Sequence, residues 1–568
     1  MVNLKISLLF GIMVLGLMSG CKQGSATLAI VNETQQPSQT PRPITATPFR
    51  VATKTAAPPS VMPDSEIRIY FDSAVPATLE NQISFPAGIR IVAHQEDANL
   101  IFGPVDLSDS STLWIYALVT PFSSLIEQIS LSDLRAIWTG QVDSTQILVN
   151  NNTRAALDHI LGISDSKNVG VVHSYDLLAH AWAERDVLAI VPFETLEPRW
   201  KVVSIDGKSP IANKFDLNTY PLGLAYGWEG DLRALGRMKI AMNNGLAPPP
   251  TTNRDPNKLS VMVMTGVTAL VRATATRMEE MGMTYPGEAI RDWLIEADLT
   301  HISNEVSFSP DCPDPQMSQP SLFFCSKPEY IELLDNIDTD IIELTGNHGV
   351  DWGRESLLFS LDLYRQRGWA YYAAGEDLNR AREAITVEHN GNKFAFMGCN
   401  PAGPEFIWAT ETQAGVANCD YPWIWERIRA LSQDGYNVIF TFQYFETYRH
   451  WVLPFEEQDF RSMAEAGAVI VSGSQAHHPM VMEFYRESFI HYGLGNLFFD
   501  QMWVDTVTIP QGTRKEFIDR HVFYDGQHIS TELLTAFLED YSQPRPMSSV
   551  EREEFLKEIF STAGWGPY

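Results

Sequence analysis

Apolar segments of strand length that end abruptly in polar residues recur through the second half of the chain. They run from residues 259–264 into Thr265-Gly266, from 340–344 into Asn347-His348, from 438–442 into Gln443, and from 469–471 into a loop with His477. Strands this apolar are buried on both faces, as in sheets that helices cover on both sides. A helix predicted over residues 355–367, before Gly368, fills one of the intervals. The pattern predicts an α/β fold.

Polar side chains at the ends of these strands are the candidates for a functional site. In open α/β sheets, ligands lie beyond the carboxyl ends of the strands, so the loops should share one crevice. The candidates are Gly266, Glu305, Asn347, His348, Gln443, Glu446, Gln475, His477, His478, His491 and Asn496.

The first half of the chain shows a looser alternation of short strands and helices. Strands are predicted at residues 67–71, 89–93, 113–119 and 187–191. The alternation indicates a separate α/β domain over residues 65–242. A linker is predicted at residues 243–258, which contain Pro248-Pro249-Pro250. The second domain is then 259–510, followed by a C-terminal extension over 511–568 with helical patterns at 530–541 and 550–559.

The N-terminus has the features of an export signal. Lys5 precedes the apolar residues 6–18, and Ser19-Gly20 then leads to Cys21. Residues 1–21 are therefore predicted to be a signal peptide, since the apolar run is shorter than the roughly 20 residues that span a bilayer. The ending resembles the bacterial lipobox, which implies a lipid on Cys21; an ordinary cleaved signal is the alternative. Residues 22–64, rich in Pro, Thr and Ser, are predicted to form a linker.

Charge and cysteine content narrow the partners and the compartment. A formal charge of -29 argues against nucleic acid as the main partner. Besides Cys21, the cysteines form the local pairs Cys312 with Cys325 and Cys399 with Cys419. An even number outside the cytoplasm suggests two disulfides, although other pairings and free thiols stay open.

Several segments of the first half resemble the periplasmic phosphate-type solute-binding proteins. They are residues 131–140, 186–192, 205–207 and 220–222, in the order found in that family. The resemblance implies a solute-binding-protein-like α/β domain. The Ser/Thr-rich and Gly-rich turn that holds phosphate in the family has no counterpart near Asp72-Ser73-Ala74. A structural or partner-binding module is therefore an equal alternative to ligand binding.

The motifs of the second half resemble the CapA family of poly-γ-glutamate capsule-synthesis proteins. They are Asp298-Leu299-Thr300 with Glu305, Gly346-Asn347-His348 with Asp351-Trp352-Gly353, Glu446, Gly473 with His477, and Tyr492-Gly493-Leu494-Gly495-Asn496. The resemblance covers residues 259–501. It implies a calcineurin-like metallophosphatase fold, a layered αββα sandwich.

The metal ligands that this resemblance implies are incomplete. No carboxylate follows Thr265-Gly266, and Gln443 and Gln475 stand where the family has histidines. Glu305, Asn347 and His477, with the two glutamines, then form a weak single-metal site or none, because an amide oxygen does not equal imidazole for a transition metal. The resemblance implies that His348, beside Asn347, acts as a general acid; a hydrogen-bonded loop histidine is the alternative.

Together these features predict an extracytoplasmic, lipid-anchored protein of the cell envelope that takes part in capsule or poly-γ-glutamate synthesis or export. Its partners would be the anionic polymer or the polymer's synthesis machinery, and the membrane through the lipid on Cys21. One alternative is a non-catalytic binding or scaffold lipoprotein. A second alternative is a metal-dependent phosphoesterase.

Overall fold

The computed structural model describes residues 66–85, 88–142, 145–165, 167–243, 248–319, 321–502 and 511–566. The predicted signal peptide, Cys21 and the linker at residues 22–64 lie outside the described residues. Within these ranges, no helix is both long enough and apolar enough to cross a membrane.

The first folded part is built on a mixed sheet with the strand order β2-β1-β3-β11-β4-β8-β6-β7. Its strands are β1 Ile67–Phe71, β2 Ile89–Ile91, β3 Leu100–Pro104, β4 Thr112–Pro121, β6 Ile147–Val149, β7 Val169–Val171, β8 Leu188–Pro192 and β11 Gly223–Gly230. Its helices are α1 Ala77–Glu80, α2 Leu131–Trp138, α3 Asn151–Leu161, α4 Leu177–Glu184 and α5 Leu232–Asn243. Trp114, Tyr116 and Trp138 are fully buried in its core.

The second folded part contains two larger sheets. The first has the order β15-β14-β13-β12-β25-β26-β27, with β24 beside β12. Its strands are β12 Leu259–Thr268, β13 Leu299–Asn304, β14 Ile341–Glu343, β15 Ala370–Tyr372, β24 Asn496–Phe498, β25 Lys515–Tyr524, β26 Gln527–Glu539 and β27 Gln543–Pro546. The second sheet has the order β17-β18-β20-β21-β23-β22. Its strands are β17 Ile385–His389, β18 Asn392–Cys399, β20 Asn437–Gln443, β21 Ala468–Ser474, β22 Met482–Tyr485 and β23 Ser488–His491.

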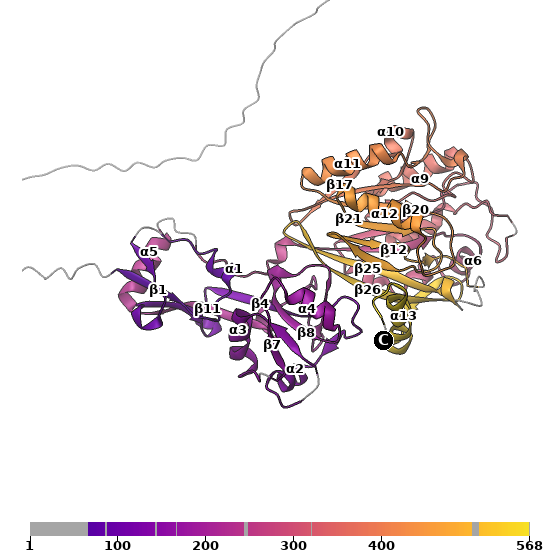
Figure 1. Cartoon of the computed structure of the whole chain (residues 1–568). Coiled ribbons are helices and arrows are strands. Elements are labelled where there is room, and N and C mark those ends of the chain that lie inside the picture. The colour runs from indigo at the N-terminus through magenta and orange to yellow at the C-terminus, as the bar shows by residue number, and fades with distance from the viewer. Residues whose placement is uncertain are drawn as a thin grey trace, which may run out of the picture. The chain divides into compact units, whose positions relative to one another are not determined.

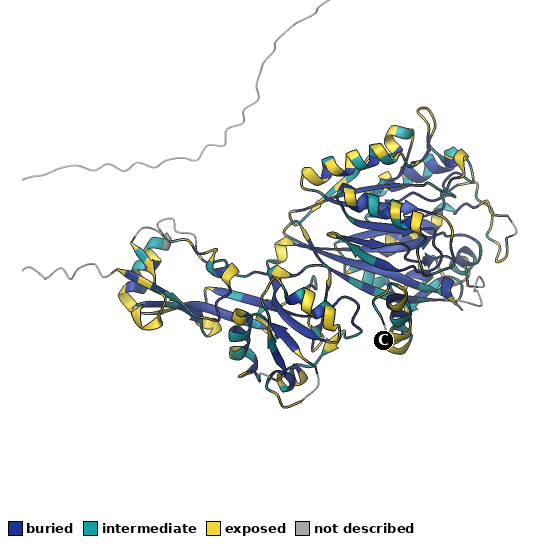
Figure 2. Cartoon of the chain, viewed as in Figure 1, coloured by how far each residue is buried: buried dark blue, intermediate teal, exposed yellow. Residues whose placement is uncertain are grey.

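These sheets face each other with helices on their outer sides, which confirms the predicted αββα sandwich (Figure 1). Met262 and Phe517 of one sheet and Phe396 and Phe489 of the other pack together in the central core. Outside the first sheet lie α6 Arg272–Met281, α8 Ile331–Asn336 and α9 Arg354–Arg367; outside the second lie α11 Tyr421–Gln433 and α12 Pro454–Ala466. The strands are buried and the outward helix faces are exposed (Figure 2).

Helix α9 ends as the sequence predicts. Gly368 adopts a left-handed conformation with φ of 74°, and its backbone N–H is bonded to carbonyls of the last turn. A glycine accepts this conformation without steric cost. Residues 285–295 form a 3-10 turn at Tyr285–Gly287 and the short helix α7 Arg291–Ile295.

The helix predicted at residues 530–541 is wrong, because this segment is strand β26. Leu533 and Phe537 face the core between the sheets, while Leu534 and Ala536 face the outer helices. A strand that is apolar on both faces lacks the alternation that identifies strands in a sequence. Strand β25 pairs antiparallel with β12, so the predicted C-terminal extension supplies strands of the same sheet; α13 Ser549–Thr562 matches the second helical pattern.

Candidate functional site

Loops from both sheets bring a group of buried polar side chains together. Glu305 directly follows β13, and Asn347 lies in the loop after β14. Gln443 is the last residue of β20, and Gln475 directly follows β21. The carboxyl ends of parallel strands in both sheets therefore form the site, as the strand pattern predicts.

The side-chain amide of Gln443 is the centre of this group. Its Nε2 lies 3.1 Å from Glu305 Oε1 and 3.1 Å from Asn347 Oδ1, and it also donates to Gln475 Oε1. The hydroxyl of Ser474 donates to Gln443 Oε1. An ionised carboxylate only accepts hydrogen bonds, so the nitrogen of the amide faces Glu305.

The amide thus lies among three oxygen acceptors, of which Glu305 and Gln475 are buried and Asn347 is half-buried. Glu305, Gln475 and the donor Gln443 are at most 6% exposed. An amide nitrogen carries two hydrogens, so it serves two of the three acceptors fully at any moment. A buried polar group that loses its partner costs about 1–3 kcal/mol, so the arrangement depends on the Gln443 amide.

His348 is held beside this group by a carboxylate. Its Nδ1 lies 2.6 Å from Asp351 Oδ2, and its ring packs edge-on against Phe324 at 4.7 Å between centroids. Burial lowers the pKa of His348, but the hydrogen bond to Asp351 and the charge of Glu305 outweigh it, so the pKa is raised above its usual value. The side chain is 19% exposed, so the ring reaches solvent.

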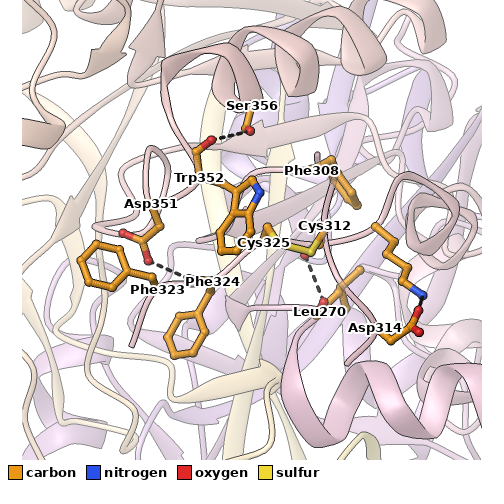
Figure 3. Close-up of a disulfide and its surroundings, with 12 residues drawn as sticks. Leu270, Phe308, Cys312, Asp314, Phe323, Phe324, Cys325, Asp351, Trp352 and Ser356 are labelled. Carbon is orange, nitrogen blue, oxygen red and sulfur yellow. Dashed lines mark hydrogen bonds and ion pairs between the residues drawn. A yellow bond between two sulfur atoms is a disulfide. The ribbon is translucent and has the colours of Figure 1, made fainter. Parts of the chain in front are cut away.

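A disulfide-bridged loop fixes the position of Asp351 (Figure 3). Cys312 and Cys325 are bonded at 2.06 Å, and the backbone N–H of the next-door Phe324 donates to Asp351 Oδ2 at 2.9 Å. The same carboxylate oxygen therefore receives both the loop and the His348 ring. Cys399 and Cys419 are bonded in the same way at 2.03 Å, so both local pairs are present.

His477 and Asn496 form a second pair, and both side chains are buried. His477 Nδ1 lies 2.8 Å from Asn496 Oδ1, and Asn496 Nδ2 donates to the carbonyl of Thr513. Gly266 lies where β12 meets the turn before β24, since a Cβ there would lie 2.2 Å from the carbonyl oxygen of Gly495. Gly266 therefore allows a close approach of two backbones rather than contributing chemistry.

Three predicted crevice residues do not join the group around Gln443. His491 ends strand β23 of the second sheet, and its side chain points toward the first sheet. It therefore lies in the core between the sheets, where Nδ1 is 2.6 Å from Asp519 Oδ2 of β25. His478 faces His450 and Tyr448, and burial together with His450 lowers its pKa to about 4. Glu446 is exposed and accepts a hydrogen bond from Tyr448.

Arg272 is a part of this region that the sequence did not indicate. Its guanidinium lies between the rings of Phe324 and Phe499, at 5.0 and 4.9 Å from the centroids, and its Nε donates to Asp500 Oδ1 at 3.1 Å. Asp500 Oδ2 also accepts the backbone N–H of Ala273 at the start of α6. These partners come from segments more than 50 residues apart, so no local pattern could have linked them.

The donor set does not fit a two-metal centre. Within the described ranges, no three His, Cys, Asp or Glu side chains are grouped so that they could hold a metal ion. The group around Gln443 supplies one carboxylate and three amides, and an N–H occupies the point where its oxygens converge. Hydrolytic two-metal sites need several carboxylates or imidazoles aimed at the cations.

Comparison with known proteins finds sequences similar to the second half of this chain. The family described as "Bacterial capsule synthesis protein PGA_cap" matches residues 261–501. The chain is 24% identical over 266 residues to the "Capsule biosynthesis protein CapA" of Bacillus anthracis, covering 45% of this chain and 64% of that protein. It is 26% identical over 182 residues to the "PGA biosynthesis protein CapA" of Bacillus subtilis (strain 168), covering 31% and 47%. The chain thus spans between about half and two thirds of these relatives.

Among solved structures, the chain is similar to an ABC-type phosphate transport receptor from Vibrio cholerae. The sequences are 12% identical, the TM-score is 0.27, and the match covers 33% of this chain and 100% of the receptor.

Proposed function

We propose that the chain is a cell-envelope component of capsule-polymer synthesis or export that works by binding, because residues 261–501 match the family described as "Bacterial capsule synthesis protein PGA_cap". For the polymer we propose the poly-γ-glutamate type, because the Bacillus subtilis relative is a PGA biosynthesis protein by name. We place the protein outside the cytoplasm, tethered by a lipid on Cys21, on the strength of the N-terminal pattern.

One observation carries the choice of binding over hydrolysis. The Gln443 amide nitrogen holds Glu305, Asn347 and Gln475 together by hydrogen bonds at the point where their oxygens converge, which is where a cation would have to bind. A hydrogen-bonded amide is neutral, so it neither polarises a phosphoryl group nor activates a water as a divalent cation does. The loops keep their shape through hydrogen bonds instead.

The charges near the crevice favour protein machinery as the partner over the polyanion itself. Arg272 is paired with Asp500, Arg449 with Glu456, and Lys327 with Glu279 and Asp314. With a net charge of -29, the chain offers a polyanion little attraction. We therefore propose that it contacts the synthesis or export machinery.

The double variant Gln443→His plus Gln475→His is expected to gain a metal. It replaces the central amide and one of its acceptors by imidazoles beside Glu305, Asn347 and His477, and histidine tolerates the left-handed backbone of residue 475, φ 72°. Elemental analysis of the full chain, purified without chelators, should find little metal in the wild type and about one Zn²⁺ or Mn²⁺ per chain in the variant.

The control is Gln413→His, at an exposed position remote from the group, which should not change the metal content. Two tightly held cations per wild-type chain would refute the binding proposal, as would metal-dependent turnover of bis(p-nitrophenyl) phosphate by the wild type.

A second candidate, acid-catalysed hydrolysis, rests on the pair His348 and Asp351. Asp351 accepts from Nδ1 and the pKa of His348 is raised, so in the protonated ring Nε2 carries a second proton that it can donate. If the chain hydrolyses a phosphoester, His348→Gln should lower kcat by about 100-fold or more, whereas Glu446→Gln should not. Absence of any turnover in the wild type would exclude this candidate and leave binding.

A further inference from the structure

The first folded part contains two adjoining hollows, which are separate from the group around Gln443 in the second folded part. Their volumes are about 450 and 500 Å³, and Asn150, Asn152 and Ser174 line both. This size is within the range of small-molecule sites. The hollows lie at the carboxyl ends of β6 and β7, where ligands of α/β sheets bind.

An aromatic platform borders the hollows. The ring of Tyr175 is stacked on that of His173, with 5.5 Å between centroids and 10° between planes. Tyr175 is nevertheless 81% exposed. A large ring held parallel to another and left open to solvent provides a flat apolar face for a ligand.

The rest of the lining is mostly neutral and rich in paired donors and acceptors. Side-chain amides come from Asn150, Asn151 and Asn152, and hydroxyls from Thr78 and Ser174. Asn152 reaches across the cleft, where its Nδ2 donates to the carbonyls of Ser73 and Val75 at 3.1 and 3.2 Å. Amides and hydroxyls both donate and accept, which matches the hydroxyl groups of a polyol.

The charges of the lining are unfavourable for an anion. Among the described lining residues, the basic side chain is that of Arg199. It forms an ion pair with Glu197, whose carboxylate oxygens lie 2.7 Å from Nε and 2.8 Å from Nη2. Asp176 lines one hollow, and Glu194 accepts the hydroxyl of Thr78 at the edge of the other. Among the described residues that line the two hollows, a phosphate ion would meet these carboxylates with no unpaired Lys or Arg to offset them.

We infer that this cleft binds an uncharged sugar, with one ring stacked on Tyr175 and its hydroxyls bonded to the asparagine cluster, in place of phosphate. The inference does not depend on the capsule role proposed for the second folded part.

Isothermal titration calorimetry on the full chain tests the inference. The probes are the methyl α-glycosides of glucose, galactose and mannose, N-acetylglucosamine, and inorganic phosphate, each up to about 10 mM. At least one sugar should bind with a Kd between about 1 µM and 1 mM, and phosphate should not bind. Tyr175→Ala should weaken sugar binding about tenfold or more, whereas Tyr175→Phe, which keeps the ring, should bind within about twofold of the wild type.

The matched control is Phe323→Ala, which removes an exposed ring, 55% accessible, from the second folded part. It should leave sugar binding unchanged. Binding of phosphate without any sugar overturns the inference, and so does an absence of binding by all the sugars. Wild-type affinity in Tyr175→Ala overturns it as well, since the exposed ring would then not carry the site.

Discussion

Acidification from about pH 7 to about pH 5 is expected to remove on the order of 5 kcal/mol of the stability that buried neutral histidines contribute, whereas buried carboxyls with raised pKa values, such as Glu516 and Glu343, act in the opposite direction. His301, His521 and His528 are buried between and beside the sheets. Burial lowers the pKa of His301 and of His528 to about 3, and burial with the neighbouring histidines lowers that of His521 well below its usual value. Protonation would place charge on rings whose neighbours, Tyr372 and Thr531, offer hydroxyls rather than carboxylates.

The sign follows from which state binds the protons. In the unfolded chain a histidine takes up its proton below about pH 6.5, whereas in the folded chain His301 and His528 stay neutral down to about pH 3, and the pKa of His521 lies well below its usual value. The unfolded state thus binds more protons in this window, so stability is full above it and falls as the pH drops.

Urea unfolding followed by circular dichroism at several pH values measures this loss. Between about pH 7 and about pH 5, His301→Gln should lose about 2 kcal/mol less stability than the wild type, because it lacks one buried ring whose pKa is lowered. His94→Gln, at an exposed position, should lose as much as the wild type. A loss in His301→Gln equal to that of the wild type would contradict the prediction.

The variant Gly266→Ala is expected to lose about 3 kcal/mol of stability or to fail to fold. The added methyl would lie 2.2 Å from the carbonyl oxygen and 2.8 Å from the carbonyl carbon of Gly495, and both are backbone atoms that cannot rotate away. Strand β12 would have to move from β24, and with it the turn that leads to Asn496.

Gly236→Ala is the matched control for this variant. Gly236 lies in helix α5, and a Cβ there meets no atom within 4 Å. Alanine should stabilise this helix by up to about 1 kcal/mol, because glycine costs more backbone entropy. Thermal unfolding by calorimetry compares the two variants. A Gly266→Ala protein as stable as Gly236→Ala would show that β12 and β24 can separate without cost.

The sandwich and its strand-end crevice could be predicted because buried strands and polar ends are local features. In the sequence, the apolar residues 438–442 are followed directly by the polar Gln443. In the structure, these residues belong to strand β20, and Gln443 is its last residue. The conformation of Gly368 was predictable for the same reason. Each of these depends on neighbours along the chain rather than on distant contacts.

The missed features depend on contacts between distant segments. Strand β26 looked helical because both of its faces are covered, by the second sheet and by the outer helices. Arg272 gained its role from Phe324, Phe499 and Asp500, which come from other loops. His491 was predicted to lie near the site because it comes shortly after the loop with His477 in the sequence. Its side chain lies instead in the core between the sheets, where it contacts Asp519.

The pairing of β12 with β25 also determines when the sheet can be completed during synthesis of the chain. Residues 259–265 meet residues 518–524 across about 260 positions of sequence, in the middle of the sheet. While the ribosome is still making the polypeptide, β12 lacks this neighbour until about 260 further residues have been synthesised. The nascent sandwich therefore has an unpaired strand edge over that interval, and closing it is a slow, long-range step that holding chaperones would be expected to protect.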